Sequence, residues 1–372
     1  MNAVGLIFAD SYDVHMDELT EKRTMAAVSF GGRYRVIDFT LSNMVNAGIR
    51  NIGVITTQKY SSLMWHVRSG SAWDLDRKQS GLRFLPPFAT ENVGTAFANR
   101  LEAMQANLAY LKEVKEKYVL FSTSNYIANI DFDKMMKFHI DSGATVTTLY
   151  TRSPLHKEKS MPITSYDINE DGQITGADLD CDYNEADNLG ISTFIMDREE
   201  LISILSRTAR EGKTSFRKDV LLDLIKSKKV MACETEDSIL FLDDLSCYLE
   251  SNMELLNQEI RDELFQNKKR PVITRVKDSA PARYGKDAKA VNSIIADGAI
   301  IDGEVRNSII FRGVRVKKGA VVENSVVLQD TTVGEGAHIN YAVLDKEVII
   351  NDSRLLSGYV THPFYVGKGT VI

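Results

Sequence analysis

A short unit recurs in the last quarter of the chain and restricts the possible fold more than any other feature. The units "NSIIADG", "NSIIFRG", "NSVVLQD" and "NYAVLDK" begin at Asn292, Asn307, Asn324 and Asn340, at intervals of 15, 17 and 16 residues. Such repetition is typical of a parallel β-helix, in which each coil buries its apolar residues against the next coil. Ordinary hairpins are the alternative, but hairpins would not require the asparagine unit itself to recur.

The part of the chain before these repeats alternates between strand and helix patterns. The runs "AVGLIF", "NIGVIT", "YVLF" and "ATVTTLY" predict strands, and residues 95–117 carry apolar side chains at helical spacing. Such alternation is typical of an α/β domain. We therefore predict an α/β domain over 1–260, a linker over 261–289 and a β-helix over 290–372.

Composition excludes several classes of protein. The 372 residues are 44% hydrophobic and 26% charged, which is enough for two packed domains. Three cysteines without a CxxC pair indicate neither a zinc site nor a disulfide framework, so we expect a reducing, cytoplasmic location. The apolar start ends at Asp10, too early for a membrane span or a signal sequence. A net charge of -6 argues against general nucleic-acid binding.

The stretch "SNYIAN" at 124–129 follows the predicted strand 118–121. Open α/β sheets bind their ligands at the carboxyl ends of the strands. An enzyme that transfers nucleotidyl groups would need a carboxylate at such a point to hold the divalent ion that neutralises phosphate charge. The sequence instead provides Asn125.

The stretch "RTMAAVSFGGRYRVIDFTLSNMVNAGIRNIGVIT" at 23–56 resembles bacterial glucose-1-phosphate adenylyltransferase, which makes ADP-glucose for glycogen synthesis. The similarity continues through "LPP" at 85–87, "NLGISTFIM" at 188–196, "SNMELL" at 251–256 and the repeats. This resemblance implies a Rossmann-like nucleotidyltransferase domain with a mixed sheet, followed by a left-handed β-helix of hexapeptide-type repeats. It also implies assembly as a tetramer.

Members of this family carry a glycine-rich phosphate loop that ends in an arginine after the first strand. Here the loop is "FADSYDVHMDELT", with Asp10, Ser11 and Asp13 in place of glycines and His15 in place of the arginine. Carboxylates beside a triphosphate would repel it, and side chains would block the close approach that glycine permits. A working loop of different shape is the alternative.

Four further positions lack the ionic groups that the resemblance implies: Met25, Phe97, Asn125 and Phe241. Met25 replaces the phosphate-binding lysine, and the other three replace aspartates, two of which would hold metal. Shifting the alignment would bring Asp243 or Asp244 to the second metal position, but it would break the downstream match. We therefore expect no catalytic residues and no metal, with magnesium relevant only to residual activity.

Basic positions that this family uses around its allosteric effector are still present, at Lys22, Arg23, Arg35 and Arg315. Guanidinium groups bind phosphate with two hydrogen bonds, so such a cluster suits a phosphorylated effector. A solvated basic face or structural ion pairs are the alternative.

The resemblance and its departures together predict a regulatory, catalytically degenerate subunit. It would assemble with a catalytic adenylyltransferase subunit as a tetramer, or with copies of itself, and it would bind neither nucleic acid nor membrane. A slow but genuine glucose-1-phosphate adenylyltransferase is the alternative. A hexapeptide-repeat acyltransferase, with His338 as its base, is a third possibility that no acyl-CoA feature supports.

Overall fold

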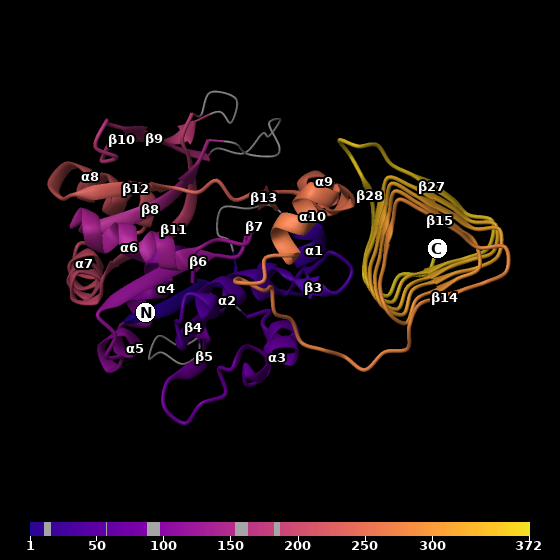
Figure 1. Ribbon diagram of the computed structural model, residues 1–372, viewed down its shortest axis with the longest axis horizontal. Helices are drawn as coiled ribbons and strands as arrows, with labels where there is room; N and C mark the ends of the chain where they lie inside the picture. The colour runs from indigo at the N-terminus through magenta and orange to yellow at the C-terminus, as the bar shows by residue number, and fades with distance from the viewer. Residues whose placement is uncertain (11–15, 57, 88–96, 153–162, 182–186) are drawn as a thin grey trace.

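The computed structural model describes residues 1–10, 16–56, 58–87, 97–152, 163–181 and 187–372. An α/β domain lies beside a stack of triangular coils (Figure 1). Within the described residues, the main sheet of the first domain has nine strands. Seven follow the order β10-β9-β11-β6-β1-β4-β5; β8 also pairs with β11, and β12 pairs with β8. Strands β1, β4, β5 and β6 are parallel, whereas β11 is antiparallel to β6, so the sheet is mixed as predicted.

The elements of the first domain follow the predicted periodicities. Its strands are β1 (Ala3–Phe8), β2 (Ser29–Phe30), β3 (Tyr34–Arg35), β4 (Asn51–Ile55), β5 (Gly81–Leu85), β6 (Tyr118–Thr123), β7 (Tyr126–Ile127), β8 (Val146–Thr151), β9 (Ile163–Ile168), β10 (Ile174–Cys181), β11 (Leu189–Asp197), β12 (Val230–Glu234) and β13 (Leu240–Phe241). Its helices are α1 (Asp17–Thr20), η1 (Met25–Ala27), α2 (Val36–Asn46), α3 (Ser61–Val67), η2 (Ser71–Trp73), α4 (Arg100–Ala106), α5 (Leu108–Glu113), α6 (Phe132–Ser142), α7 (Arg198–Arg210), η5 (Phe216–Leu221), α8 (Leu222–Ser227), α9 (Leu245–Met253), η6 (Glu254–Leu256) and α10 (Gln258–Phe265).

Helices cover both faces of the main sheet. Along β6, Leu120 belongs to one hydrophobic cluster, while its neighbours Val119 and Phe121 belong to another. This alternation is the period of two that a strand buried on both sides requires. Helices α2, α3 and α6 contribute to the first cluster, and α4, α5, α7 and α8 contribute to the second.

The repeats form three parallel sheets of five strands each over residues 283–366, all of which are described. This architecture is consistent with the left-handed β-helix that the resemblance implies. The strands are β14 (Arg283–Tyr284), β15 (Lys289–Val291), β16 (Ile294–Ile295), β17 (Ile300–Ile301), β18 (Glu304–Arg306), β19 (Ile309–Ile310), β20 (Arg315–Val316), β21 (Val321–Glu323), β22 (Val326–Val327), β23 (Thr332–Val333), β24 (His338–Asn340), β25 (Ala342–Leu344), β26 (Ile349–Ile350), β27 (Leu355–Ser357) and β28 (Phe364–Val366). The first coil begins before residue 290, the predicted boundary. The sequence did not reveal this start, because β14 and β15 precede the first asparagine unit at Asn292.

One corner of each of the first four coils has a left-handed backbone, which asparagine tolerates better than most residues. Asn292, Asn307 and Asn324 occupy this corner with φ of 42°, 44° and 48°. In the next coil, however, the corner residue is Tyr341, with φ of 46°. Asn340 pairs with Glu323 instead, so the fourth unit of the sequence repeat is displaced by one residue from the structural repeat.

The β-helix packs directly on the first domain. Its interior and the side chains of α2, α9 and α10 belong to one continuous hydrophobic cluster. In strand β19, both Ile309 and Ile310 are fully buried and belong to this cluster, although successive residues of a strand point to opposite sides. The two domains therefore share a core. No helix in the described part of the chain is long and apolar enough to cross a membrane.

Candidate functional site

Asn125 and Phe241, two of the positions predicted to lack catalytic groups, lie at the carboxyl end of the main sheet. Asn125 follows β6, and Phe241 pairs with Tyr126 in a two-stranded ladder between β13 and β7. The Asn125 carboxamide Oδ1 accepts a hydrogen bond from Thr123 Oγ1 at 2.7 Å. The backbone oxygen of Asn125 accepts one from Leu242 N at 2.9 Å. The structure thus brings these two positions together, as their predicted roles require.

The side chains at this edge pack as apolar core residues. Phe241 is 8% exposed and belongs to the cluster that contains Tyr126, whereas Phe97 is 7% exposed and belongs to the cluster that contains Phe8. Met25, in η1, is 2% exposed and belongs to the core shared with the β-helix. None of these three side chains can carry charge.

These residues do not fit a magnesium clamp. A neutral amide is a poor magnesium ligand, and the Phe241 ring has no ligand atom. Asp244 caps helix α9, where its Oδ1 accepts a hydrogen bond from Cys247 N at 2.7 Å. Among the described residues there is no group of three or more His, Cys, Asp or Glu side chains that could hold a metal ion.

Part of the phosphate loop can also be described. Asp10 follows β1, and its Oδ1 accepts a hydrogen bond from the backbone N–H of Met25 at 3.3 Å. A carboxylate therefore accepts a hydrogen bond from a backbone donor at the end of β1, where the resemblance implies a phosphate loop. Ser11, Asp13 and His15 lie outside the described residues. His338, considered as an acyltransfer base, is an exposed residue of β24 whose Nε2 lies 3.4 Å from Glu323 Oε2.

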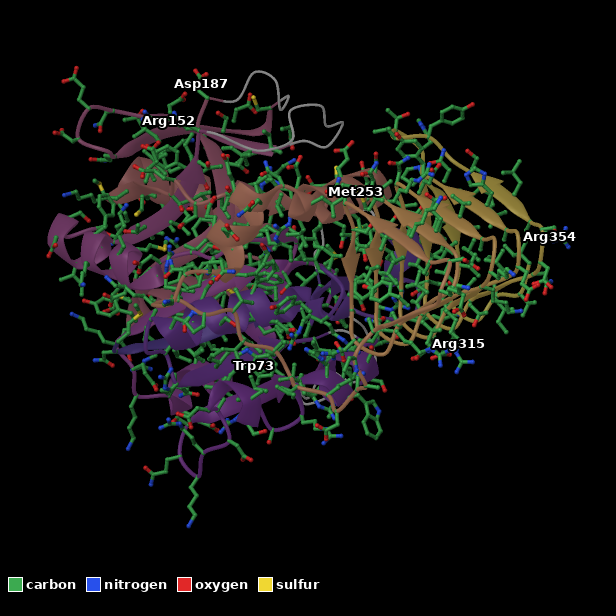
Figure 2. The ribbon with its side chains drawn as sticks, turned by 45° about the vertical axis from the view of Figure 1, so that its right-hand side comes forward. Trp73, Arg152, Asp187, Met253, Arg315 and Arg354 are labelled. Carbon is green, nitrogen blue, oxygen red and sulfur yellow. The ribbon has the colours of Figure 1, made fainter. Side chains whose placement is uncertain are left out.

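A strongly basic cavity of about 320 Å³ lies at the junction of the two domains. Its described lining includes Lys22, Arg23 and Arg35, three of the four predicted effector residues. Arg315 does not line this part of the molecule; it is exposed on β20, on the outer surface of the β-helix (Figure 2). Arg312, three residues earlier, lines the cavity instead.

The sequence analysis missed most of this cavity. Its further basic residues are Arg33, Arg275, Lys277, Arg312, Lys346 and Lys368, against two lining acids, Asp330 and Glu347. Arg33 comes from the turn between β2 and β3, and the others come from the linker and from coils far apart in the sequence. The basic residues of the linker and the "DKE" of the last repeat were the sequence features that could have indicated these lining residues. No local pattern, however, predicts that they lie beside Arg35.

Some of these charges are already paired. Arg23 binds Asp345 through both guanidinium nitrogens, at 2.9 and 2.7 Å, and Arg312 Nε lies 2.9 Å from Asp297 Oδ1. Lys368 lies 3.4 Å from Glu347. Arg23 therefore contributes an interdomain ion pair, which was the structural alternative to a role in effector binding.

Other basic groups face the cavity without a carboxylate in a described salt bridge. Arg35 Nη1 donates to Ser62 O at 2.6 Å and to Ser62 Oγ at 3.0 Å. Burial lowers the pKa of Arg35 to about 10, and nearby cations add to this effect. Burial also lowers the pKa of Lys346 well below its ordinary value, assisted by Arg35 and Arg23. An anion in the cavity would relieve this repulsion.

Comparisons with known proteins agree with the architecture. Residues 14–174 match the nucleotidyl transferase family, and residues 279–357 match the family described as GlmU-like, C-terminal hexapeptide. The glucose-1-phosphate adenylyltransferases of Bacillus cereus, Bacillus mycoides and Bacillus anthracis are each 31% identical over 357 residues, which cover 95% of this chain and 94% of each relative. With both domains matched in order, the chain belongs to the glucose-1-phosphate adenylyltransferase family.

Proposed function

We propose that this protein is a non-catalytic, regulatory subunit of glucose-1-phosphate adenylyltransferase. It assembles with an active subunit, as a tetramer in the cytoplasm, and it changes that subunit's activity or its response to a phosphorylated effector. Under this proposal the chain itself needs no magnesium.

The packing of the catalytic edge is the observation that carries the proposal. The positions for a phosphate lysine and a metal aspartate hold Met25 and Phe241, and both side chains are buried among apolar neighbours. A metal ion and a positioned cation each supply several kcal/mol to the transition state of phosphoryl chemistry. Losing both reduces the rate by many orders of magnitude.

The basic cavity supports the regulatory half of the proposal. Met25 and Phe241 provide no phosphate-binding charge at the described catalytic edge, whereas such charge is abundant at the domain junction, where Arg35 and Lys277 come from the first domain and the linker and Lys346 comes from the β-helix. A bound anion would contact both domains. Ligand binding at such a junction can bias the arrangement of the domains and of the subunits that they contact.

The test compares the chain alone with the mixture. The purified chain should show negligible turnover with ATP, glucose 1-phosphate and magnesium. Mixed with an active glucose-1-phosphate adenylyltransferase subunit, it should form a hetero-oligomer with higher activity or an altered effector response. Turnover of the isolated chain within about tenfold of an ordinary enzyme, at roughly 10 per second, would support the slow-enzyme alternative instead.

A further inference from the structure

Helix α3 exposes an apolar surface on the side that does not face the core. An open cavity of about 580 Å³ is lined by a set of residues that we name the α3 patch: Gln58, Tyr60, Ser61, Met64, Trp65 and Arg68. Trp65 is 70% exposed and Met64 is 42% exposed. The other side of the same helix buries Leu63, His66 and Val67. The fold therefore does not need the Trp65 indole for its own packing.

The α3 patch has the composition of a protein interface. Tryptophan, tyrosine, methionine and arginine are enriched at interfaces, whereas lysine, aspartate, glutamate, serine and alanine are depleted. All four enriched types line the patch, and Ser61 is the one residue of a depleted type in its described lining. The backbone of Arg68 is also strained, with φ of 53° and ψ of -128°. Strain of this kind persists where the surrounding structure enforces it, often at functional sites.

The positive charge in and around the α3 patch favours a partner surface that carries negative charge. Arg68 is its only charged lining residue among those described, and the neighbouring residues Lys59 and Arg275 add positive charge. We propose that the α3 patch docks a protein surface that presents carboxylates around an apolar centre. This inference rests on the proposed function, under which that surface belongs to the catalytic subunit.

Helix α3 also separates the patch from the basic cavity. Ser62 and His66 line the cavity from this helix, and Arg35 donates to the backbone and hydroxyl of Ser62. Arg275, another cavity residue, donates from Nη1 to the backbone oxygen of Trp65 at 2.7 Å. An anion that draws Arg35 or Arg275 into the cavity changes the contacts of α3. Docking of the partner and binding of the anion are therefore coupled, and the coupling is reciprocal.

The experiment measures assembly of the whole chain with an active glucose-1-phosphate adenylyltransferase subunit. Trp65→Ala and Met64→Ala are compared with wild type and with Ile140→Ala, which removes an exposed apolar side chain from α6. Iodide quenching provides a second readout, because Trp65 is exposed and the only other tryptophan, Trp73, is 2% exposed. Phosphate titrations of the mixture test the coupling.

Under the proposal, Trp65→Ala weakens assembly at least about tenfold, Met64→Ala weakens it less and Ile140→Ala leaves it unchanged. Iodide quenching of the wild-type chain falls when the partner is added. If wild type and Trp65→Ala assemble equally well, the docking surface is wrong and the regulatory function stands. If wild type does not assemble, both proposals are overturned. If Trp65→Ala affects only self-association, the patch binds a second copy, which also overturns the inference.

Discussion

Arg23 and Asp345 form a buried ion pair that joins the two domains across 322 sequence positions. The guanidinium Nη1 and Nη2 donate to the two carboxylate oxygens at 2.9 and 2.7 Å, and the side chains are 4% and 2% exposed. Tyr365 OH lies 3.1 Å from Asp345 Oδ2, and the N–H of Lys346 donates to Oδ1 at 2.7 Å. This carboxylate therefore binds groups from both domains, and its removal should affect their contact.

Arg23→Ala should destabilise the protein by about 3–5 kcal/mol, because it leaves the buried Asp345 carboxylate without its cation. Chemical denaturation measures this change. Lys22→Ala is the matched control: Lys22 is exposed and adjacent, and its variant should unfold like wild type. Equal stability of the two variants would mean that the ion pair does not hold the junction.

Arg35→Ala should weaken binding of inorganic phosphate to the isolated chain by about tenfold or more, because it removes charge-assisted hydrogen bonds to the anion. Calorimetric titration measures the affinity. Arg315→Ala is the control, since Arg315 lies on the outer surface of the β-helix, and it should bind phosphate as wild type does. Melting without phosphate checks that the Arg35 variant is folded. Unchanged affinity in that folded variant would assign Arg35 a purely structural role.

Asn125→Asp should leave the fold intact and activity undetectable, because one carboxylate still lacks its metal partner and the phosphate lysine. Phe241→Asp should instead lower the free energy of unfolding by at least about 3 kcal/mol, because it replaces a buried ring with a charge. Denaturation and turnover assays on both variants test this contrast. Measurable turnover from the Asn125 variant alone would contradict a degenerate cleft.

His139 should make the protein less stable in mild acid. It is 3% exposed, its Nδ1 lies 2.9 Å from Thr147 Oγ1, and burial lowers its pKa to about 4. The unfolded chain, with an imidazole pKa of about 6.5, binds the proton more readily. Stability is therefore complete above about pH 6.5 and is lost as pH falls towards 4, by up to about 3 kcal/mol.

The His139→Gln variant should lose most of this pH dependence in denaturation curves recorded between pH 7 and 4. His362→Gln is the control, because His362 is exposed. If the stability of the His139→Gln variant depends on pH as strongly as that of wild type, other groups cause the acid sensitivity.

Truncation after Asn267 should yield an aggregating fragment that does not assemble with a catalytic subunit. The β-helix and helices α9 and α10 share one hydrophobic cluster, so removing the coils exposes part of that cluster to water. Size-exclusion chromatography with and without the partner measures the outcome. A monodisperse fragment that assembles normally would show that the β-helix contributes nothing to assembly.

The sequence by itself determined the elements and their kind. The runs at 3–8 and 118–121 lie in strands β1 and β6, and the run at 144–150 overlaps strand β8, because short apolar runs are local properties of the chain. The asparagine unit predicted the β-helix for the same reason. The family motifs located Asn125 and Phe241, which the structure then placed beside each other through the β13–β7 ladder.

Only the tertiary structure decided what each basic residue does. Arg312 and Arg315 are three residues apart in one repeat, yet the coil turns the first towards the domain junction and the second outwards. Asn340 begins the fourth sequence unit, but β24 pairs with β21 in a register that places Asn340 opposite Glu323. Tyr341 therefore occupies the left-handed corner position of that coil. Arg23 and Arg35 match the same family site, but Asp345, more than 300 positions away, neutralises only Arg23. Such outcomes depend on which distant surfaces pack together, and local periodicity carries no information about distances between elements that meet only in the folded core.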